Sequence, residues 1–332
     1  MKTIFVTGSE GFIGSHLIEK LLKLNFKVKT FIQYNSFNSV GWLSNLKKKD
    51  FEKLEIFFGD VRDFDSVSHA MKKSDYVFHL AALIAIPYSY RSPSSYIDTN
   101  ITGTLNVMQA AKMNNIKKVI HTSTSEVYGS AQFVPITEHH PLVGQSPYAA
   151  SKIGADQIAI SINKSFSVPL IIIRPFNTFG PRQSLRAVIP TIINQFIRKT
   201  QKIYLGNINT SRDFNYVEDI CDGFISALKS KLNKGETFNL ATGKDIKIKE
   251  VIKKLEKITK HKPEIIIQKK RIRPLDSEVN RLVGSNLKAK RFLKWKPKYH
   301  GSSGFEKSLI KTYQWYEENQ EIYNDNFLQY NL

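Results

Sequence analysis

Cysteine and long hydrophobic runs are the two plainest absences in this sequence of 332 residues. The single cysteine, Cys221, excludes an intrachain disulfide and a multi-thiolate metal site, and we expect it to be a small buried helix residue. His139 and His140 lack a third ligand at suitable spacing, so no metal is expected. The longest apolar runs, such as residues 168–173, are far below the roughly 18–20 residues that span a bilayer. Residues 1–6 read as a strand and not as a signal segment, so we expect a cytoplasmic protein without a membrane partner.

Acidic residues are scarce relative to basic ones. The 49 Lys and Arg against 29 Asp and Glu give a formal net charge of +20. Such a charge suits nucleic acid, an anionic membrane or a phosphorylated small molecule. The lysines form short groups along the whole chain, with no basic arm and no interleaved aromatic platform. This distribution favours a solvated basic surface over nucleic-acid binding, and that surface would still attract a substrate that carries phosphates.

Short β-type runs alternate with helical stretches in the first half of the chain, which is typical of a parallel sheet covered on both faces. The predicted strands are residues 3–7, 27–33, 54–58, 76–79, 117–121 and 168–173, and the predicted helices are residues 13–24, 65–73, 94–113 and 146–165. After Arg174 the pattern is mixed, with a last helix near residues 305–320. We predict an α/β fold, with a Rossmann-like doubly wound parallel sheet in residues 1–174 and a smaller mixed α/β substrate-binding lobe in residues 175–332, some segments of which cross back.

Three glycines follow the first predicted strand and open a helix. Glycine there permits a tight turn and a close approach of the backbone to a pyrophosphate at the helix N-terminus. The spacing is G-x-x-G-x-x-G and departs from the generic G-x-G-x-x-G, but its place between strand and helix supports a dinucleotide site. The candidate residues are Gly8, Gly11, Phe12, Ile13 and Gly14.

The acidic residue expected at the end of the second strand, where it would bind the adenosine ribose, is missing. Neutral candidates stand there instead, namely Gln33, Asn35 and Ser36. A carboxylate would repel a 2′-phosphate, so its absence leans toward NADP, although no arginine is present and NAD stays open. Asp60 and Val61, after the third strand, are candidates for adenine binding, and a strand-end cap is an equally good interpretation.

A candidate proton-transfer site lies between residues 123 and 152. Thr124, Ser125 and Glu126 follow a predicted strand, whose end would present their side chains to a cleft. Tyr148 precedes Lys152 by four residues on a predicted helix. This spacing puts the phenol and the ammonium on one face, where the cation can favour ionisation of the phenol.

With these motifs in order, the chain resembles the extended short-chain dehydrogenase/reductase superfamily from Met1 to about Pro297. Residues 79–82 and Asn100 also carry the likeness, which implies that Leu80, Ala81, Ala82 and Asn100 line the NAD(P) site. Within the superfamily the chain looks most like the nucleotide-sugar 4,6-dehydratases. Residues 34–43 resemble the branch that acts on N-acetylglucosamine nucleotides in legionaminic acid synthesis, a part of cell-surface polysaccharide biosynthesis.

The resemblance implies a reaction that begins with oxidation at C4 of the sugar. Tyr148 would take the C4 hydroxyl proton while hydride passes to the nicotinamide, Thr124 would bond the same oxygen, and Lys152 would lower the pKa of Tyr148 and bind the ribose. Glu126 would remove the C5 hydrogen, and Glu126 with Ser125 would help the C6 hydroxyl leave as water before hydride returns to C6. Many of these dehydratases have Asp where this chain has Ser125. Because serine is a poor acid at neutral pH, Glu126 must carry more of the elimination.

The resemblance also implies substrate and partner contacts. Asn177, Arg182, Arg212 and Arg273 match family positions that hold phosphate or ribose, and the planar fork of arginine can bind two phosphate oxygens. GDP- or UDP-N-acetylglucosamine is the expected substrate. The helices near residues 94–113 and 146–165 resemble those through which family members form homodimers.

Three other functions are weighed against this one. A 4-epimerase needs no base for C5 and usually lacks a carboxylate at the position of Glu126. A UDP-glucuronate decarboxylase can share Thr-Ser-Glu but needs a cation for the substrate carboxylate, and no uniquely placed one is evident. The intact set of Thr124, Glu126, Tyr148 and Lys152 argues against a non-catalytic dinucleotide-binding protein.

Overall fold

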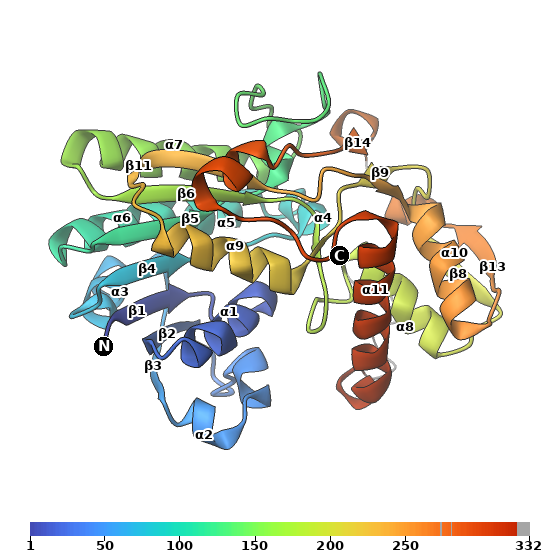
Figure 1. Ribbon diagram of the computed structural model, residues 1–332, viewed down its shortest axis with the longest axis horizontal. Coiled ribbons are helices and arrows are strands. Elements are labelled where there is room, and N and C mark those ends of the chain that lie inside the picture. The colour runs from blue at the N-terminus through green and yellow to red at the C-terminus, as the bar shows by residue number, and fades with distance from the viewer. Residues whose placement is uncertain (273, 280, 324–332) are drawn as a thin grey trace.

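The structure, a computed structural model, describes residues 1–272, 274–279 and 281–323. At its centre is a sheet of seven strands in the order β11-β6-β5-β4-β1-β2-β3 (Figure 1). The strands are β1 (Thr3–Thr7), β2 (Lys27–Gln33), β3 (Leu54–Gly59), β4 (Tyr76–His79), β5 (Lys118–Thr122), β6 (Leu170–Pro175) and β11 (Lys234–Leu240). Every neighbouring pair is parallel. The predicted Rossmann-like α/β fold is confirmed.

Helices cover both faces of this sheet, which explains why its inner strands are apolar along their length. All six residues of β6 are buried. On one face lie α1 (Phe12–Lys23) and α9 (Val217–Lys229), and on the other α3 (Phe64–Met71), α6 (Gly103–Met113) and α7 (Pro147–Phe166) (Figure 1). The strand order reverses between β1 and β4, so a crevice for a ligand is expected at the carboxyl ends of these two strands.

The remaining elements are short or belong to the second lobe. The larger helices of that lobe are α8 (Val188–Ile197), α10 (Ile248–Thr259) and α11 (Gly301–Glu318). Its small sheets pair β13 (Glu264–Ile267) with β8 (Lys202–Leu205), β10 (Asn215–Tyr216) with β7 (Thr178–Phe179), and β9 (Ser211–Arg212) with both β12 (Ile246–Lys247) and β14 (Arg281–Leu282). Short helical segments are η1 (Gly41–Asn45), α2 (Lys48–Phe51), α4 (Ile86–Ser89), α5 (Pro93–Tyr96), η2 (Ile97–Thr102), η3 (Ser125–Tyr128), η4 (Lys269–Arg271), η5 (Leu275–Ser277), η6 (Ala289–Leu293) and η7 (Gln320–Ile322).

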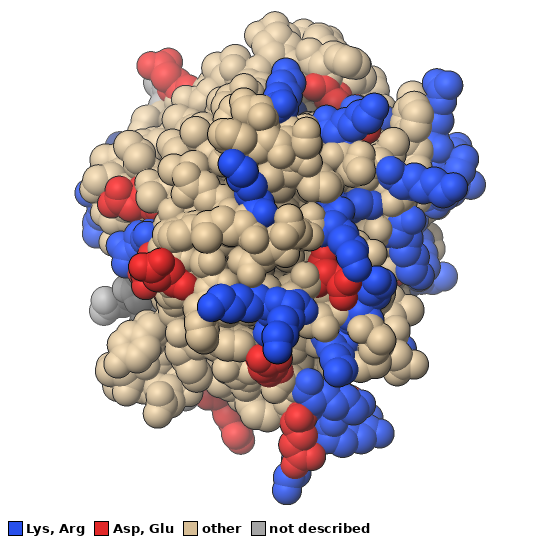
Figure 2. Space-filling model, turned by 90° about the vertical axis from the view of Figure 1, so that its left-hand side faces the viewer, with Lys and Arg blue, Asp and Glu red and all other residues tan. Residues whose placement is uncertain are grey.

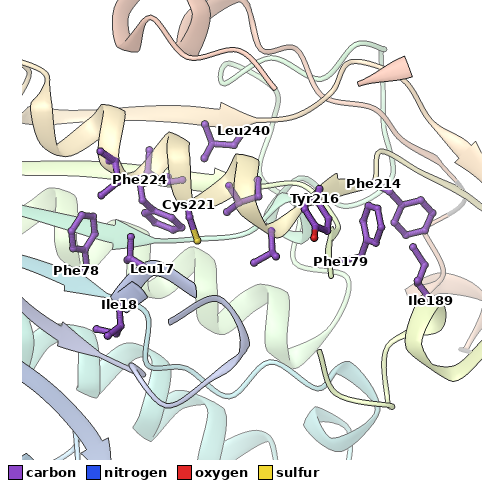
Figure 3. Packing of buried hydrophobic residues seen from close by; sticks show 14 of the residues in the cluster. Leu17, Ile18, Phe78, Phe179, Ile189, Phe214, Tyr216, Cys221, Phe224 and Leu240 are labelled. Carbon is purple, nitrogen blue, oxygen red and sulfur yellow. The ribbon is translucent and has the colours of Figure 1, made fainter. Parts of the chain in front are cut away.

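One hydrophobic core extends from the Rossmann sheet into the second lobe. Leu17 and Ile18 of α1 pack in the same cluster as Phe224 of α9, and that cluster continues to Phe179 and Ile189 beyond residue 174 (Figure 3). Both α9 and β11 return to the sheet from the second half of the chain. The division at residue 174 stays a prediction.

Two details of the fold differ from the sequence prediction. The helix predicted over residues 94–113 consists of α5, a π-helical segment η2 and α6, and β11 was not predicted. Cys221 is buried on α9, which confirms its predicted place. No helix among the described residues is long and apolar enough to cross a membrane. Figure 2 shows one face of the molecule, on which Lys and Arg are spread widely with fewer acidic residues between them.

Asp213, which follows β9, fastens three segments of the second lobe together. Its carboxylate accepts hydrogen bonds from the backbone N–H groups of Thr242 at 2.8 Å, Gly243 at 2.9 Å and Gly284 at 3.2 Å. The Thr242 hydroxyl is a further donor at 2.6 Å. Asp213 is completely buried, so water cannot replace a lost acceptor.

We predict that Asp213→Asn lowers the free energy of unfolding by about 2–3 kcal/mol, because an amide nitrogen cannot accept the bonds that one carboxylate oxygen accepts. Urea denaturation followed by circular dichroism measures the change. Asp50→Asn is the control, since that carboxylate pairs with Lys53 at the surface and its loss should leave the urea midpoint almost unchanged. Equal losses in the two variants would contradict the role given to Asp213.

Candidate active site

The glycine loop lies at the reversal point of the sheet, between β1 and α1. Gly8 has φ +67°, and a Cβ there would lie 2.7 Å from the backbone nitrogen of Ala81, which follows β4. A Cβ on Gly14 would lie 2.1 Å from the Gly8 carbonyl oxygen. A side chain is therefore excluded at Gly8 and at Gly14, and such bare positions permit close contact between a pyrophosphate and the backbone.

The N-terminus of α1 fits an anionic group. Gly11 is the N-cap residue and has no side chain to bond the first N–H groups, which belong to Phe12, Ile13 and Gly14. The Ser9 hydroxyl is buried beside the loop and has no hydrogen-bond partner in the described part of the chain. These groups would hold the diphosphate of a nicotinamide dinucleotide.

The segment after β2 is held by its own side chains. Asn35 donates to the carbonyl oxygens of Gln33 at 3.1 Å and Ser39 at 3.0 Å, and its side-chain oxygen accepts from the Ser39 N–H at 2.9 Å. Asn35 therefore shapes the loop, while Gln33 and Ser36 are exposed at its surface. The structure also brings Glu10 of the glycine loop here, because its carboxylate accepts from the Gln33 N–H at 3.1 Å.

Asp60 follows β3 and is paired with Arg62, whose Nε lies 3.0 Å from each Asp60 oxygen. The first cause of the lowered pKa of Asp60 is this hydrogen bond. An open hollow of about 400 Å³ is lined by Asp60, Arg62, Asp98 and other residues. Val61, which lies between Asp60 and Arg62 in the sequence, is buried. This hollow lies at the carboxyl end of β3, where the adenine was expected.

The segment after β4 carries Leu80, Ala81 and Ala82. It is fastened to η2 by Asn100, whose side chain accepts from the Leu83 N–H at 2.9 Å and donates to the Leu83 carbonyl oxygen at 3.0 Å. Asn100 also donates to Ser151 of α7 at 2.9 Å. The predicted cofactor residue Asn100 thus aligns this segment with the helix that carries Tyr148 and Lys152.

Three of the predicted catalytic side chains come together after β5. Thr124 is the N-cap residue of η3, and its hydroxyl accepts from the Glu126 N–H at 3.2 Å. The Thr124 hydroxyl lowers the pKa of Tyr148, and the Glu126 carboxylate is close enough to Tyr148 to raise it. Ser125 is 2% exposed, so it lies beneath the surface of this site.

Tyr148 and Lys152 project from the first turns of α7, which starts at the Ser146 N-cap and Pro147. Burial is the main cause of the raised pKa of Tyr148, and the Thr124 hydroxyl opposes it. Burial also lowers the pKa of Lys152 to about 8, and its amine donates to the Thr122 carbonyl oxygen at 2.7 Å.

A buried ionic cluster lies one turn further along α7, around Asp156. Its carboxylate accepts from the Ser123 hydroxyl at 2.8 Å and from Arg174 of β6 at 2.9 Å, and it lies 3.2 Å from His121 of β5. Burial alone would raise the pKa of Asp156, but the bond with His121 and the charges of Arg174 and Lys152 lower it. The negative charge of Asp156 in turn raises the pKa of Lys152. Sequence reasoning missed Asp156, although its spacing of four from Lys152 was a usable signal.

The predicted substrate residues are less closely grouped. Asn177 has a buried side-chain oxygen without a partner among the described residues, so it is available to a ligand. Arg182 bonds Ser15 at 3.2 Å and pairs with Glu19, both on α1. Arg212 is buried and lies 3.5 Å from Glu278. Arg273 lies outside the described residues.

His79 and His140 form hydrogen bonds and ring contacts within the protein. His79 bonds the hydroxyls of Thr7 at 2.8 Å and Thr104 at 3.1 Å, and burial lowers its pKa, so it is neutral. The His140 ring lies edge-on to the ring of Tyr128 and is tilted against that of Phe133. The described residues contain no group of three or more His, Cys, Asp or Glu side chains that could hold a metal ion.

Comparison with known proteins shows the family of this chain. The sequence profile of the family described as GDP-mannose 4,6 dehydratase matches residues 5–308. A UDP-glucose 4-epimerase from Cyamopsis tetragonoloba is 30% identical, with 96% of each chain covered. A solved structure of UDP-N-acetylglucosamine 4-epimerase from Methanobrevibacter ruminantium is 32% identical, with TM-score 0.84, 96% of this chain and 99% of that chain covered. The dTDP-glucose 4,6-dehydratase DesIV from Streptomyces venezuelae, solved with NAD bound, is 26% identical, with TM-score 0.82 and coverage of 97% and 99%.

The fold and the site thus define an enzyme of the extended short-chain dehydrogenase/reductase superfamily, as the sequence predicted. The chain belongs to the GDP-mannose 4,6 dehydratase family, whose relatives include NAD-dependent nucleotide-sugar dehydratases and epimerases. This membership identifies the chain as an enzyme of the nucleotide-sugar dehydratase and epimerase class.

We predict that Asp156→Asn destabilises the protein by about 3 kcal/mol, because it leaves the Arg174 guanidinium buried without a counter-charge. Urea denaturation of the two proteins measures this difference. The control is Asp222→Asn, since Asp222 pairs with Lys20 and Lys298 in a partly exposed position and its loss should cost about 1 kcal/mol or less. A loss below 1 kcal/mol for Asp156→Asn would show that the cluster does not support the site.

Proposed function

We propose that this protein is a nucleotide-sugar 4,6-dehydratase that acts on GDP- or UDP-N-acetylglucosamine. The observation that carries the proposal is the Glu126 carboxylate, which follows the N-cap residue Thr124 by two residues and is close enough to Tyr148 to raise its pKa. Oxidation at C4 needs one proton acceptor at the C4 oxygen, whereas loss of water across C5 and C6 needs a second base for the C5 hydrogen. A carboxylate next to the tyrosine supplies that second base.

Each step uses a group of this chain. Tyr148 accepts the proton of the C4 hydroxyl, and Thr124, whose hydroxyl lowers the pKa of Tyr148, holds the same oxygen. Once C4 is a ketone, the C5 hydrogen is acidic and Glu126 removes it. The protonated Glu126 then gives its proton to the departing C6 oxygen, so that one carboxyl group serves as base and acid in turn. When hydride returns to C6, C5 takes a proton that comes from solvent, and Tyr148 releases to solvent the proton it took from the C4 hydroxyl. Buried Ser125 orients this exchange.

The dinucleotide would be held by the glycine loop, the start of α1 and Lys152. When bound, it supplies a positive charge next to Tyr148 together with the hydride acceptor for C4 and the hydride donor for C6. Lys152 is poised for this role because its buried amine, with a pKa of about 8, has neighbouring Asp156 to keep it charged. The positive charge of Lys152 favours the phenolate of Tyr148 over the phenol.

The second lobe would bind the nucleotide diphosphate. Asn177 offers an unpartnered buried oxygen, and Arg212 and Arg273 are the proposed phosphate ligands. Arg182 is proposed with them, although its guanidinium now joins the lobe to α1. The similarity to a UDP-N-acetylglucosamine 4-epimerase supports an N-acetylglucosamine nucleotide. A place in legionaminic acid synthesis, the homodimer and the cytoplasmic location stay predictions.

The test is incubation of the protein and NAD with GDP- and UDP-N-acetylglucosamine in deuterated water. We expect a product lighter by one water without an added reductant, and exchange of the C5 hydrogen. Glu126→Gln should lower turnover by about 10²–10⁴ and abolish C5 exchange, because it removes only the second base. Reduced nicotinamide should accumulate in this variant, since oxidation at C4 is retained, and its absorbance can be followed.

Two variants serve as controls. Tyr148→Phe should prevent formation of reduced nicotinamide altogether, because it removes the acceptor for the C4 hydroxyl proton. Ser125→Ala should lower turnover by less than about tenfold. An unchanged product mass with inverted C4 would identify an epimerase, and release of carbon dioxide from UDP-glucuronate would identify a decarboxylase. C5 exchange at the parent rate in Glu126→Gln would overturn the role of Glu126.

A further inference from the structure

A carboxylate from another segment of the chain lies at the end of β2, although β2 has no acidic residue at its own end. Gln33 is the last residue of β2, and its N–H donates to Oε1 of Glu10 at 3.1 Å. Glu10 lies in the glycine loop, between Gly8 and Gly11, and is 23 residues away along the chain. The loop thus carries an acidic side chain to the position where parallel sheets of this type bind the adenosine ribose.

The surroundings of Glu10 hold it in this place. Its carbonyl oxygen accepts from the Trp42 N–H at 3.0 Å. Gly41 has φ +53°, and a Cβ there would lie 2.8 Å from the same oxygen, so the segment after β2 packs directly on the glycine loop. The second carboxylate oxygen, Oε2, is buried and has no hydrogen-bond partner among the described residues.

This arrangement leaves Glu10 with an unused acceptor. Burial raises the pKa of Glu10, while the N–H groups of Gln33 and of Glu10 itself oppose that shift. An unpartnered buried oxygen costs free energy unless a ligand or water pairs with it. A ribose hydroxyl is a donor that could do so after a small rotation of the side chain.

We propose that Glu10 takes the place of the missing acidic residue after β2 and selects NAD over NADP. The carboxylate can accept a bond from a ribose 2′-hydroxyl, whereas a 2′-phosphate would bring like charges together in a partly buried site. The sequence favours NADP only when an acidic residue is expected at the end of β2 itself. The inference rests on the proposed use of a nicotinamide dinucleotide, and not on the dehydration itself.

The nearby cation does not favour a 2′-phosphate. Arg62 follows β3, the strand beside β2, and is the guanidinium that a phosphate would need. Both Asp60 oxygens lie 3.0 Å from its Nε, so its charge is already balanced. A 2′-phosphate would have to compete with Asp60 for this cation while facing Glu10.

The test is the dissociation constants of NAD and NADP, measured by isothermal titration with the full-length protein and no sugar nucleotide. We expect the parent protein to bind NAD at least about tenfold more tightly than NADP. Glu10→Gln should bring the two constants to within about threefold, mainly through tighter NADP binding, because the amide removes the repulsion. Thermal denaturation of the variant checks that it is folded.

Glu52→Gln is the matched control. Glu52 is exposed at the end of α2, just before the amino end of β3. The variant therefore removes the same charge at the end of the strands opposite to Glu10. It should leave the NAD-to-NADP ratio unchanged.

Two results would overturn the proposal: equal affinities for NAD and NADP in the parent protein, or an unchanged ratio of the two affinities in Glu10→Gln. An unchanged ratio with both cofactors weakened would mean that Glu10 only shapes the loop. Because no sugar is present, each of these results leaves the proposed dehydration untouched. A failure of dehydration would likewise leave the measured ratio valid.

Discussion

The site depends on the hydrogen bonds and ion pairs of the buried Asp156 carboxylate. It stands on α7 and meets Arg174 of β6, Ser123 after β5 and His121 on β5, so one buried anion fixes the helix against two neighbouring strands. Its bonds set the height and rotation of α7, and therefore the positions of Tyr148 and Lys152. A buried charge of this kind is tolerated only because donors surround it. The cluster is thus both the support of the site and part of its electrostatics.

Much of the fold could be predicted from sequence because its inner strands are continuous apolar runs, as in β1 and β6. β11 escaped prediction because its first half is polar and only its last three residues are buried. The π-helical turn η2 inside residues 94–113 carries no distinctive sequence pattern. The hydrophobic periodicity of a sequence indicates which residues are buried. It indicates neither the register of strand pairing nor the type of helix.

The candidate site shows the same limit. Tyr148, Lys152, Thr124 and Glu126 could be found because they are spaced along one strand end and one helix face. Glu10 meets β2 only through the turn geometry of the glycine loop, which no local pattern encodes. Arg182 was predicted for substrate from its motif, yet its partner Glu19 is 163 residues away. Contacts of this range depend on the packing of whole elements, and so they become visible only in three dimensions.

The shared hydrophobic core has a consequence for how ligands enter and leave. Leu17, Phe224 and Phe179 belong to one cluster across both halves of the chain, and β11 is hydrogen-bonded into the Rossmann sheet. Two bodies joined in this way cannot swing apart as hinged domains do, because opening would expose the packed interior. Exchange of a ligand must therefore occur through movements of surface segments, while the scaffold beneath them stays rigid.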